Sequence, residues 1–183
     1  KLRSLGSTFG LLFSHLNESQ MKQLPWSKVA LLALDVDGVL TDGHLLIDGS
    51  GGVVKRFFVR DGSGIVRVRR LGIKVCWITG RSDAATQQRA KELGIDQLIE
   101  GCHDKAQALQ RLCFQYECTS DQVAYVGDDL LDLPALKESG IACVPANAHA
   151  VVKEVADYVC DAQGGYGAVR EVCDHLLNAR EET

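Results

Sequence analysis

The sequence of 183 residues has no long apolar run, no excess of basic residues and no paired-cysteine motif. Its apolar runs are about the length of one β-strand, well short of the roughly 20 residues that a transmembrane helix requires. Its formal net charge of -4 gives no indication of a nucleic-acid partner. These absences argue against a membrane-spanning protein and against a nucleic-acid-binding protein.

The seven cysteines are an odd number and include no C-x-x-C pair. Most of them lie within apolar strand or helix patterns, where a thiol behaves as a small hydrophobic side chain. This usage predicts free thiols in a reducing cytoplasm rather than a disulfide framework or a zinc site.

The composition, with 46% hydrophobic and 24% charged residues, is that of an ordinary globular protein. At this length we expect a single domain, over residues 25–183. An N-terminal arm over residues 1–24 precedes it, and Met21, the only methionine, is a candidate natural start.

Strand patterns alternate with helical patterns from residue 29 to the end of the chain, which favours a Rossmann-like doubly wound α/β fold: a parallel sheet with helices on both faces. Within this series, a run of glycines separates two apolar arms and predicts a protruding β-hairpin flap over residues 43–59, with no cap domain. A helix is expected to begin near Ser63, and Ser82 is expected to cap the next one. A C-terminal tail covers residues 161–183.

The most informative stretch is LLALDVDGVLTD, residues 31–42. Its apolar run predicts a strand buried on both faces, and Asp35 and Asp37 follow at the carboxyl end of that strand, where open α/β sheets bind ligands. Alternation along an extended chain directs both carboxylates to one side. Two carboxylates so close repel each other unless a cation or a shared proton intervenes.

Later strands end in further polar residues, and right-handed crossovers bring all these ends to one edge of the sheet. The residues at those ends are Thr79, Arg81, Lys105, Asp128 and Asp129. Oxygen ligands from several carboxylates suit Mg²⁺, while no paired His or Cys suggests zinc. A lysine and a hydroxyl group suit phosphate oxygens, and of two aspartates one can attack phosphorus while the other transfers a proton.

The motifs DVDGVLTDG, ITGR, the lysine at Lys105 and YVGDDLLDLP resemble the four signature motifs of the haloacid dehalogenase-like phosphatases. The hairpin followed by VRDG, together with the tail GGYGAVREVCD, is similar to the small cap-less members that hydrolyse 3-deoxy-D-manno-octulosonate 8-phosphate. The resemblance covers nearly all of residues 29–177.

This resemblance implies that Asp35 is the nucleophile and that Asp37 is the general acid and then the base. It implies Mg²⁺ bound by the side chains of Asp35 and Asp128 and by the backbone carbonyl of Asp37, with Thr79 and Lys105 holding the phosphate. The substrate residues that it implies are Asp37, Phe58, Val59, Arg60, Asp61, Gly62, Arg81, Arg89, Lys105 and Asp129.

Three positions depart from the family pattern, in which polar residues are common. They are Phe58, Val66 and Tyr166, the last replacing an arginine between the tail glycines. These departures bear on recognition of the sugar and leave the phosphate chemistry unchanged. Asp132 is expected either to orient a metal-bound water or to cap the helix that follows it.

The resemblance also implies a cytoplasmic homotetramer whose hairpins meet at its centre, and a role in lipopolysaccharide precursor synthesis. Apolar residues on both arms of an otherwise isolated hairpin agree with burial by other copies. Three alternatives remain: a phosphatase of a nine-carbon acid sugar 9-phosphate, a receiver-like signalling domain, and a catalytically silent regulatory or assembly domain. A receiver would lack the second aspartate of the DVD motif. A catalytically silent domain would be expected to have lost Asp35 or Asp37.

Overall fold

A parallel sheet forms the centre of the molecule. The computed structural model describes residues 24–181, and its six-stranded sheet has the order β5-β4-β1-β6-β7-β8. All neighbouring strands in it are parallel. The strands are β1 (Leu31–Leu34), β4 (Lys74–Ile78), β5 (Gln97–Ile99), β6 (Val123–Val126), β7 (Ile141–Val144) and β8 (Tyr158–Val159). The predicted doubly wound α/β fold is confirmed.

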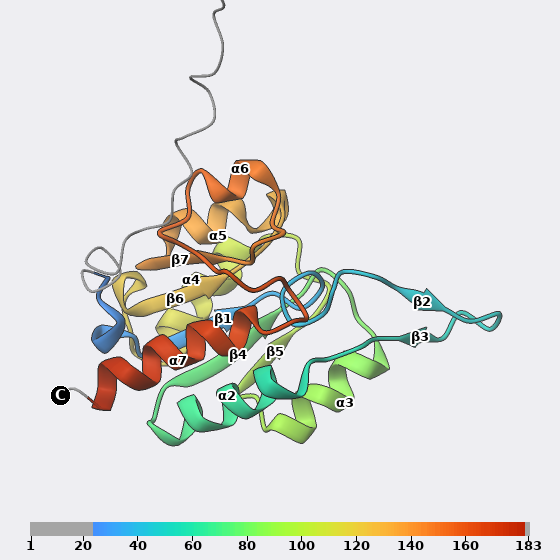
Figure 1. The fold of residues 1–183 in the computed structure, drawn as a ribbon, viewed down its shortest axis with the longest axis horizontal. Coiled ribbons are helices and arrows are strands. Elements are labelled where there is room, and N and C mark those ends of the chain that lie inside the picture. The colour runs from blue at the N-terminus through green and yellow to red at the C-terminus, as the bar shows by residue number, and fades with distance from the viewer. Residues whose placement is uncertain (1–23, 182–183) are drawn as a thin grey trace, which may run out of the picture.

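Helices cover both faces of this sheet (Figure 1). They are α2 (Val59–Arg70), α3 (Ala84–Leu93), α4 (Lys105–Gln115), α5 (Leu133–Glu138), α6 (Ala150–Lys153) and α7 (Ala168–Glu181), with short 3-10 turns η1 (Trp26–Lys28), η2 (Ser120–Gln122) and η3 (Leu130–Asp132). The side chains of β1 alternate between the two layers, as an extended chain requires. Leu32 and Leu34 pack with α2 and α7, whereas Leu31 and Ala33 pack with α4 and α5.

Helices α2 and α7 lie side by side on one face of the sheet (Figure 1). They approach so closely that a Cβ atom at Gly64 would lie 2.9 Å from Cβ of Cys173. Asp61, in the first turn of α2, accepts a hydrogen bond from the backbone N–H of Arg170 at 2.8 Å. Because the first N–H groups of a helix have no partner within the helix, Asp61 caps α7 from a neighbouring element.

Helix α2 begins earlier than the sequence pattern predicts. It starts at Val59 rather than near Ser63, so that the four residues of the VRDG motif form its first turn instead of a loop. The glycines Gly62 and Gly64 disfavour a helix by propensity alone, but packing against α7 outweighs that cost. Helix α3 is capped by Asp83 rather than by Ser82: the Asp83 side chain accepts a hydrogen bond from the N–H of Thr86.

The predicted hairpin is present and protrudes from the body of the molecule (Figure 1). Its strands are only two residues each, β2 (Leu46–Ile47) and β3 (Val53–Val54), paired antiparallel. The chain from residue 55 to residue 58 is irregular and leads directly into α2. Three apolar side chains of the hairpin are exposed: Leu46 at 64%, Ile47 at 66% and Val54 at 58%.

All seven cysteines are free, and four of them are buried, as the sequence predicts. Within residues 24–181 no helix has the length and apolar character to cross a membrane. The arm predicted over residues 1–24 lies outside the described residues, apart from Leu24, which packs partly against the core.

Candidate active site

Backbone hydrogen bonds that continue the sheet hold the site residues at the carboxyl ends of the strands. The N–H of Asp35, just after β1, donates to the carbonyl of Val126 in β6 at 2.9 Å. The N–H of Thr79, just after β4, donates to the carbonyl of Ile99 in β5 at 2.9 Å. The strand-end residues are thus fixed by the most rigid part of the fold, and the structure brings them to one edge as predicted.

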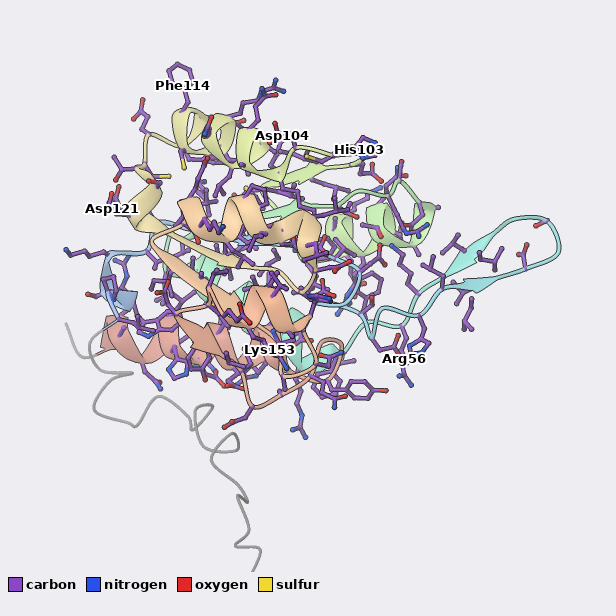
Figure 2. The ribbon with its side chains drawn as sticks, turned by 90° about the horizontal axis from the view of Figure 1, so that it is seen from above. Arg56, His103, Asp104, Phe114, Asp121 and Lys153 are labelled. Atoms are coloured by element: carbon purple, nitrogen blue, oxygen red, sulfur yellow. The ribbon has the colours of Figure 1, made fainter. Side chains whose placement is uncertain are left out.

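Asp35 and Lys105 form a buried ion pair at this edge. Nζ of Lys105 lies 2.8 Å from Oδ1 of Asp35, and the two residues are only 4% and 6% exposed. Lys105 is the first residue of α4, whose N-cap, Asp104, accepts a hydrogen bond from the N–H of Gln107. Figure 2 shows Asp104 and His103 in the turn that leads into α4.

Asp132 organises the loop that follows β6. Its carboxylate accepts hydrogen bonds from Nζ of Lys105 and from the Tyr125 hydroxyl, both at 2.7 Å, and from the N–H groups of Asp128 at 3.0 Å and Asp129 at 3.2 Å. Neither expected role describes it fully, because Asp132 is a buried hub that joins the lysine to the GDD loop. The only indication of this role in the sequence is that Asp132 lies three residues after Asp129.

The carboxylates of Asp35, Asp128 and Asp132 can each place an oxygen atom within 4.8 Å of the others. Burial raises the pKa of Asp35 against the opposing charge of Lys105. Burial and then the charge of Asp35 raise the pKa of Asp128. Oδ1 of Asp128 is buried and has no hydrogen-bond partner among the described residues. A hard divalent cation would relieve this repulsion and occupy the free oxygen, so these residues fit Mg²⁺.

The glycine of the DVDG motif is required by this arrangement. Gly38 has a φ of +98°, and a Cβ atom there would lie 2.0 Å from Oδ2 of Asp128. No other residue combines that backbone conformation with room for the Asp128 carboxylate. The carboxylate of Asp132 already accepts four hydrogen bonds, whereas Asp35 has one ion pair, with Lys105, and Oδ1 of Asp128 has no partner among the described residues. Asp35 and Asp128 are therefore the better candidates to bind a metal ion through their side chains.

Asp37 has a lysine of its own, which the sequence patterns did not reveal. Nζ of Lys55 lies 2.8 Å from Oδ1 of Asp37 and donates a hydrogen bond to Oδ2 at 2.9 Å. The same nitrogen lies 2.7 Å from Oδ2 of Asp83. Lys55 belongs to the irregular segment after β3. The only indication in the sequence that its side chain points inward is the alternation of side chains along that arm of the hairpin.

The other residues predicted to bind phosphate or substrate, Thr79, Arg81 and Arg89, differ in their burial and in their contacts. Thr79 is buried, and its hydroxyl accepts a hydrogen bond from the N–H of Arg81 at 3.2 Å. The side chain of Arg81 is exposed. Arg89, half-buried on α3, pairs with Glu92 at 2.9 Å, and Nη2 of Arg89 would lie 2.5 Å from a Cβ atom at Gly62.

The residues of the predicted substrate segment point in different directions. The Arg60 guanidinium lies 5.9 Å from the centre of the Phe58 ring, and Val59 is 76% exposed. Asp61 is 1% exposed, and its Oδ1 caps α7. Asp129 is exposed, and its own side chain accepts a hydrogen bond from the N–H of Leu130.

The tail residue Tyr166 meets the base of the hairpin. Nη2 of Arg56 donates hydrogen bonds to the Tyr166 hydroxyl and to Oδ2 of Asp42, both at 2.5 Å. Figure 2 shows Arg56 where the hairpin leaves the body of the molecule. Gly164, two residues before Tyr166, packs on the DVDG loop, since a Cβ atom there would lie 1.7 Å from the carbonyl oxygen of Gly38. The GGYG segment therefore borders the candidate site.

Comparison with known proteins places this site in a family. Residues 97–171 match the haloacid dehalogenase-like hydrolase model. The chain is 42% identical over 156 residues to the 3-deoxy-D-manno-octulosonate 8-phosphate phosphatase of Yersinia pestis, covering 85% of this chain and 83% of the relative. It is 43% identical over 152 residues to the enzyme of the same name from Escherichia coli strain K12, covering 83% and 81%.

A solved structure resembles the fold over nearly its whole length. The crystal structure of the 3-deoxy-D-manno-octulosonate 8-phosphate phosphatase of Moraxella catarrhalis, in complex with magnesium, phosphate and KDO, superimposes with a TM-score of 0.85. The two chains are 40% identical, and the match covers 92% of this chain and 95% of that one. The chain therefore belongs to the 3-deoxy-D-manno-octulosonate 8-phosphate phosphatase family of haloacid dehalogenase-like hydrolases.

Proposed function

We propose that this protein is a Mg²⁺-dependent phosphoric monoester hydrolase that converts 3-deoxy-D-manno-octulosonate 8-phosphate to the free sugar acid and phosphate, a step in lipopolysaccharide precursor synthesis. The observation that carries the proposal is the buried Asp35 carboxylate, 2.8 Å from Nζ of Lys105 and beside Asp128. The relatives named for this reaction at 40–43% identity support it.

In the proposed reaction, one carboxylate oxygen of Asp35 attacks phosphorus and the bond to the sugar oxygen breaks, which leaves an aspartyl phosphate. Asp37 gives a proton to the departing sugar oxygen. Asp37 then takes a proton from a water molecule that attacks the aspartyl phosphate, and phosphate and free Asp35 result. A receiver-like domain has no counterpart of Asp37 for these two proton transfers.

The phosphoryl oxygens would be held by the ammonium group of Lys105 and the hydroxyl group of Thr79. Asp35, Asp128 and the backbone carbonyl of Asp37 would hold Mg²⁺, which when bound supplies positive charge next to the phosphoryl oxygens. Lys105 is in position before the substrate binds, because its Nζ donates a hydrogen bond to Oδ1 of Asp132 at 2.7 Å.

The sugar acid would be bound outside the phosphate site. Arg60, Arg81 and Arg89 offer planar forks that match a carboxylate in a bidentate way. Phe58, Val59, Asp61, Gly62 and Asp129 complete the substrate set, with the side chain of Asp61 acting through the helix contact that it makes.

The experiment is steady-state phosphate release from 3-deoxy-D-manno-octulosonate 8-phosphate with Mg²⁺ and after chelation. We expect release to require Mg²⁺ and to fall by at least about 10³-fold in Asp35→Asn, because the nucleophile is lost. Asp121→Asn is the matched control: this exposed aspartate lies far from the site (Figure 2) and its loss leaves the rate unchanged. Activity that survives chelation or Asp35→Asn would refute the mechanism.

We further propose a cytoplasmic homotetramer in which the hairpins of the four copies pack together. The support is the exposed apolar hairpin of Leu46, Ile47 and Val54, which would be unstable alone in water. Light scattering should give four times the monomer mass, and Ile47→Lys should reduce it. Phe114→Lys, which replaces an apolar side chain 89% exposed on α4, should not. A wild-type monomer at micromolar concentration would contradict the proposal.

A further inference from the structure

Lys55 is a charged residue whose side chain is completely shielded from solvent. Its side chain is 0% exposed, although it lies in an irregular segment between the protruding hairpin and α2. Burial of an unpaired ammonium group would be strongly unfavourable, so its partners determine where it can lie. Those partners are the means by which this residue can influence the site.

The three donors of the ammonium group meet three partners. Besides its contacts with both oxygens of Asp37, Nζ lies 2.7 Å from Oδ2 of Asp83 and donates to Oγ1 of Thr86 at 3.0 Å. A lysine has three N–H donors, and this arrangement engages all of them. The direction of the Nζ group is thereby fixed.

Asp83 and Thr86, which hold Lys55 on the side away from Asp37, are also joined to each other. Asp83 is the N-cap of α3 and accepts the N–H of Thr86 at 2.9 Å, while the Thr86 hydroxyl donates to Oδ2 of Asp83 at 3.0 Å. Thr86 is fully buried. Lys55 is thus held by the first turn of α3, and Asp37 is the partner that lies in the candidate site.

The two aspartates of the DVD motif are therefore assigned to different lysines. Lys105 from α4 pairs with Asp35, and Lys55 from the base of the hairpin pairs with Asp37. Without separate cations, two carboxylates so close in sequence would repel each other and compete for one partner. Each carboxylate therefore has a positive partner of its own, and Lys55 restricts the orientation of the Asp37 side chain.

We propose that Lys55 is a positioning residue for the phosphatase reaction, which holds the carboxyl group of Asp37 in the orientation that this group, once protonated, requires to give its proton to the leaving sugar oxygen. The inference rests on the proposed function and extends it. Lys55 acts through Asp37 and touches neither phosphorus nor the metal ligands' side chains, and the hairpin is joined in this way to the acid and base of the reaction.

The test compares two phosphate esters that differ in their need for a proton. The leaving alkoxide of 3-deoxy-D-manno-octulosonate 8-phosphate needs a proton from Asp37, whereas the nitrophenolate of p-nitrophenyl phosphate does not. We expect Lys55→Met to lower the first-turnover rate with the sugar phosphate by about 10²-fold, the usual scale of general acid catalysis. The first-turnover release of nitrophenol should change less than about threefold, and KM for the sugar phosphate should change little.

Three further variants keep this test decisive. Lys55→Met added to Asp37→Asn should cause no further loss, because the lysine acts through that carboxylate. Lys55→Arg retains the buried positive charge. If Lys55→Met does not fold, the rates of Lys55→Arg with the sugar phosphate and with p-nitrophenyl phosphate are compared in the same way. Lys74→Met, which removes a lysine 3.4 Å from Asp96 at the opposite end of β4, is the matched control and should alter neither rate.

Equal losses with both substrates, or an unchanged sugar phosphate rate, would overturn the role of Lys55. Additive losses in the double variant would do the same. A wild-type protein that hydrolyses neither ester would instead refute the proposed phosphatase, and this outcome appears before any variant is made.

Discussion

Lys105 and Asp132 are joined by a buried ion pair of 2.7 Å, at 4% and 1% exposure. The contact links the first residue of α4 to the last residue of η3, and the same carboxylate receives the N–H groups of Asp128 and Asp129. One side chain thus positions both Lys105, the proposed phosphate-binding lysine, and the loop that carries Asp128, the proposed metal ligand.

Asp132→Asn should therefore impair both stability and catalysis. The change leaves Lys105 with one carboxylate fewer and turns an acceptor of several N–H groups into a partial donor. We expect the free energy of unfolding to fall by about 3 kcal/mol, as when one partner of a buried pair is removed. The rate should fall with it. Denaturant unfolding and kcat measure the two effects.

A surface pair provides the comparison for Asp132→Asn. Asp174 pairs with Arg170 at 2.8 Å, but its side chain is 45% exposed. Asp174→Asn should cost no more than about 0.5 kcal/mol, since exposed pairs contribute little. Similar losses for the two variants would show that Asp132 is not a hub.

Magnesium should stabilise the folded protein through Asp128. An ion that binds only the folded state at about 100 times its Kd adds about 2.7 kcal/mol, which raises Tm by about 5 °C or more in a protein of this size. Asp128→Asn should abolish this increase while Asp121→Asn preserves it, as measured by thermal unfolding with and without Mg²⁺. If Mg²⁺ raises the Tm of Asp128→Asn as much as that of the wild type, Asp128 does not bind the metal ion.

The tail glycine Gly164 should not tolerate a side chain. Its Cβ atom would lie 1.7 Å from the carbonyl oxygen of Gly38, so Gly164→Ala must displace the DVDG loop. We expect a loss of about 1–3 kcal/mol in the free energy of unfolding, together with a lower kcat. Gly49→Ala, which meets nothing within 4 Å, is the control. An unchanged kcat in Gly164→Ala would show that the tail does not position this loop.

Asp61 should make the stability of the fold depend on pH. Burial raises its pKa to about 6, against the opposing hydrogen bond from Arg170. The folded state then binds this proton more tightly than the unfolded state. The free energy of unfolding should therefore fall as the pH rises from about 4 to about 6, by about 3 kcal/mol for this group, and should level off above that range.

Asp61→Asn should remove this component, as measured by denaturant unfolding at saturating Mg²⁺ from pH 4 to pH 7. Asp96 is the control of opposite sign. Burial tends to raise its pKa, but hydrogen bonds from Arg69 and from the N–H of Val75 lower it overall. Its contribution to stability is present at neutral pH and is lost as the pH falls. A pH profile unchanged in Asp61→Asn would contradict the account of that residue.

The sequence predicted the strand-end residues well because their geometry follows from topology. Once the alternation of strands and helices indicates a parallel sheet, Asp35, Thr79 and Asp128 must share one edge. The same reasoning placed Lys105 beside them. The roles of these residues followed from a resemblance in motifs and not from the pattern of apolar residues.

Other features depend on contacts between segments distant in sequence and could not be predicted in this way. Lys55 is 18 residues from Asp37, and nothing in its own segment marks its partner. The early start of α2 at Val59 depends on packing against α7, which outweighs the glycines of its first turns. The contact of Asp61 with Arg170, 109 residues away, likewise joins segments distant in sequence.

The measurement that tests the central claim most directly is kcat/KM for a set of sugar phosphates under one set of conditions with Mg²⁺. The set contains 3-deoxy-D-manno-octulosonate 8-phosphate, a nine-carbon acid sugar 9-phosphate and simple hexose phosphates. We predict that the eight-carbon acid exceeds every other substrate by at least about 10-fold, because the relatives at 42–43% identity are named for it and because simple hexose phosphates lack the carboxylate that arginine side chains could bind. Equal values across the set, or a preference for the nine-carbon substrate, would contradict the assignment.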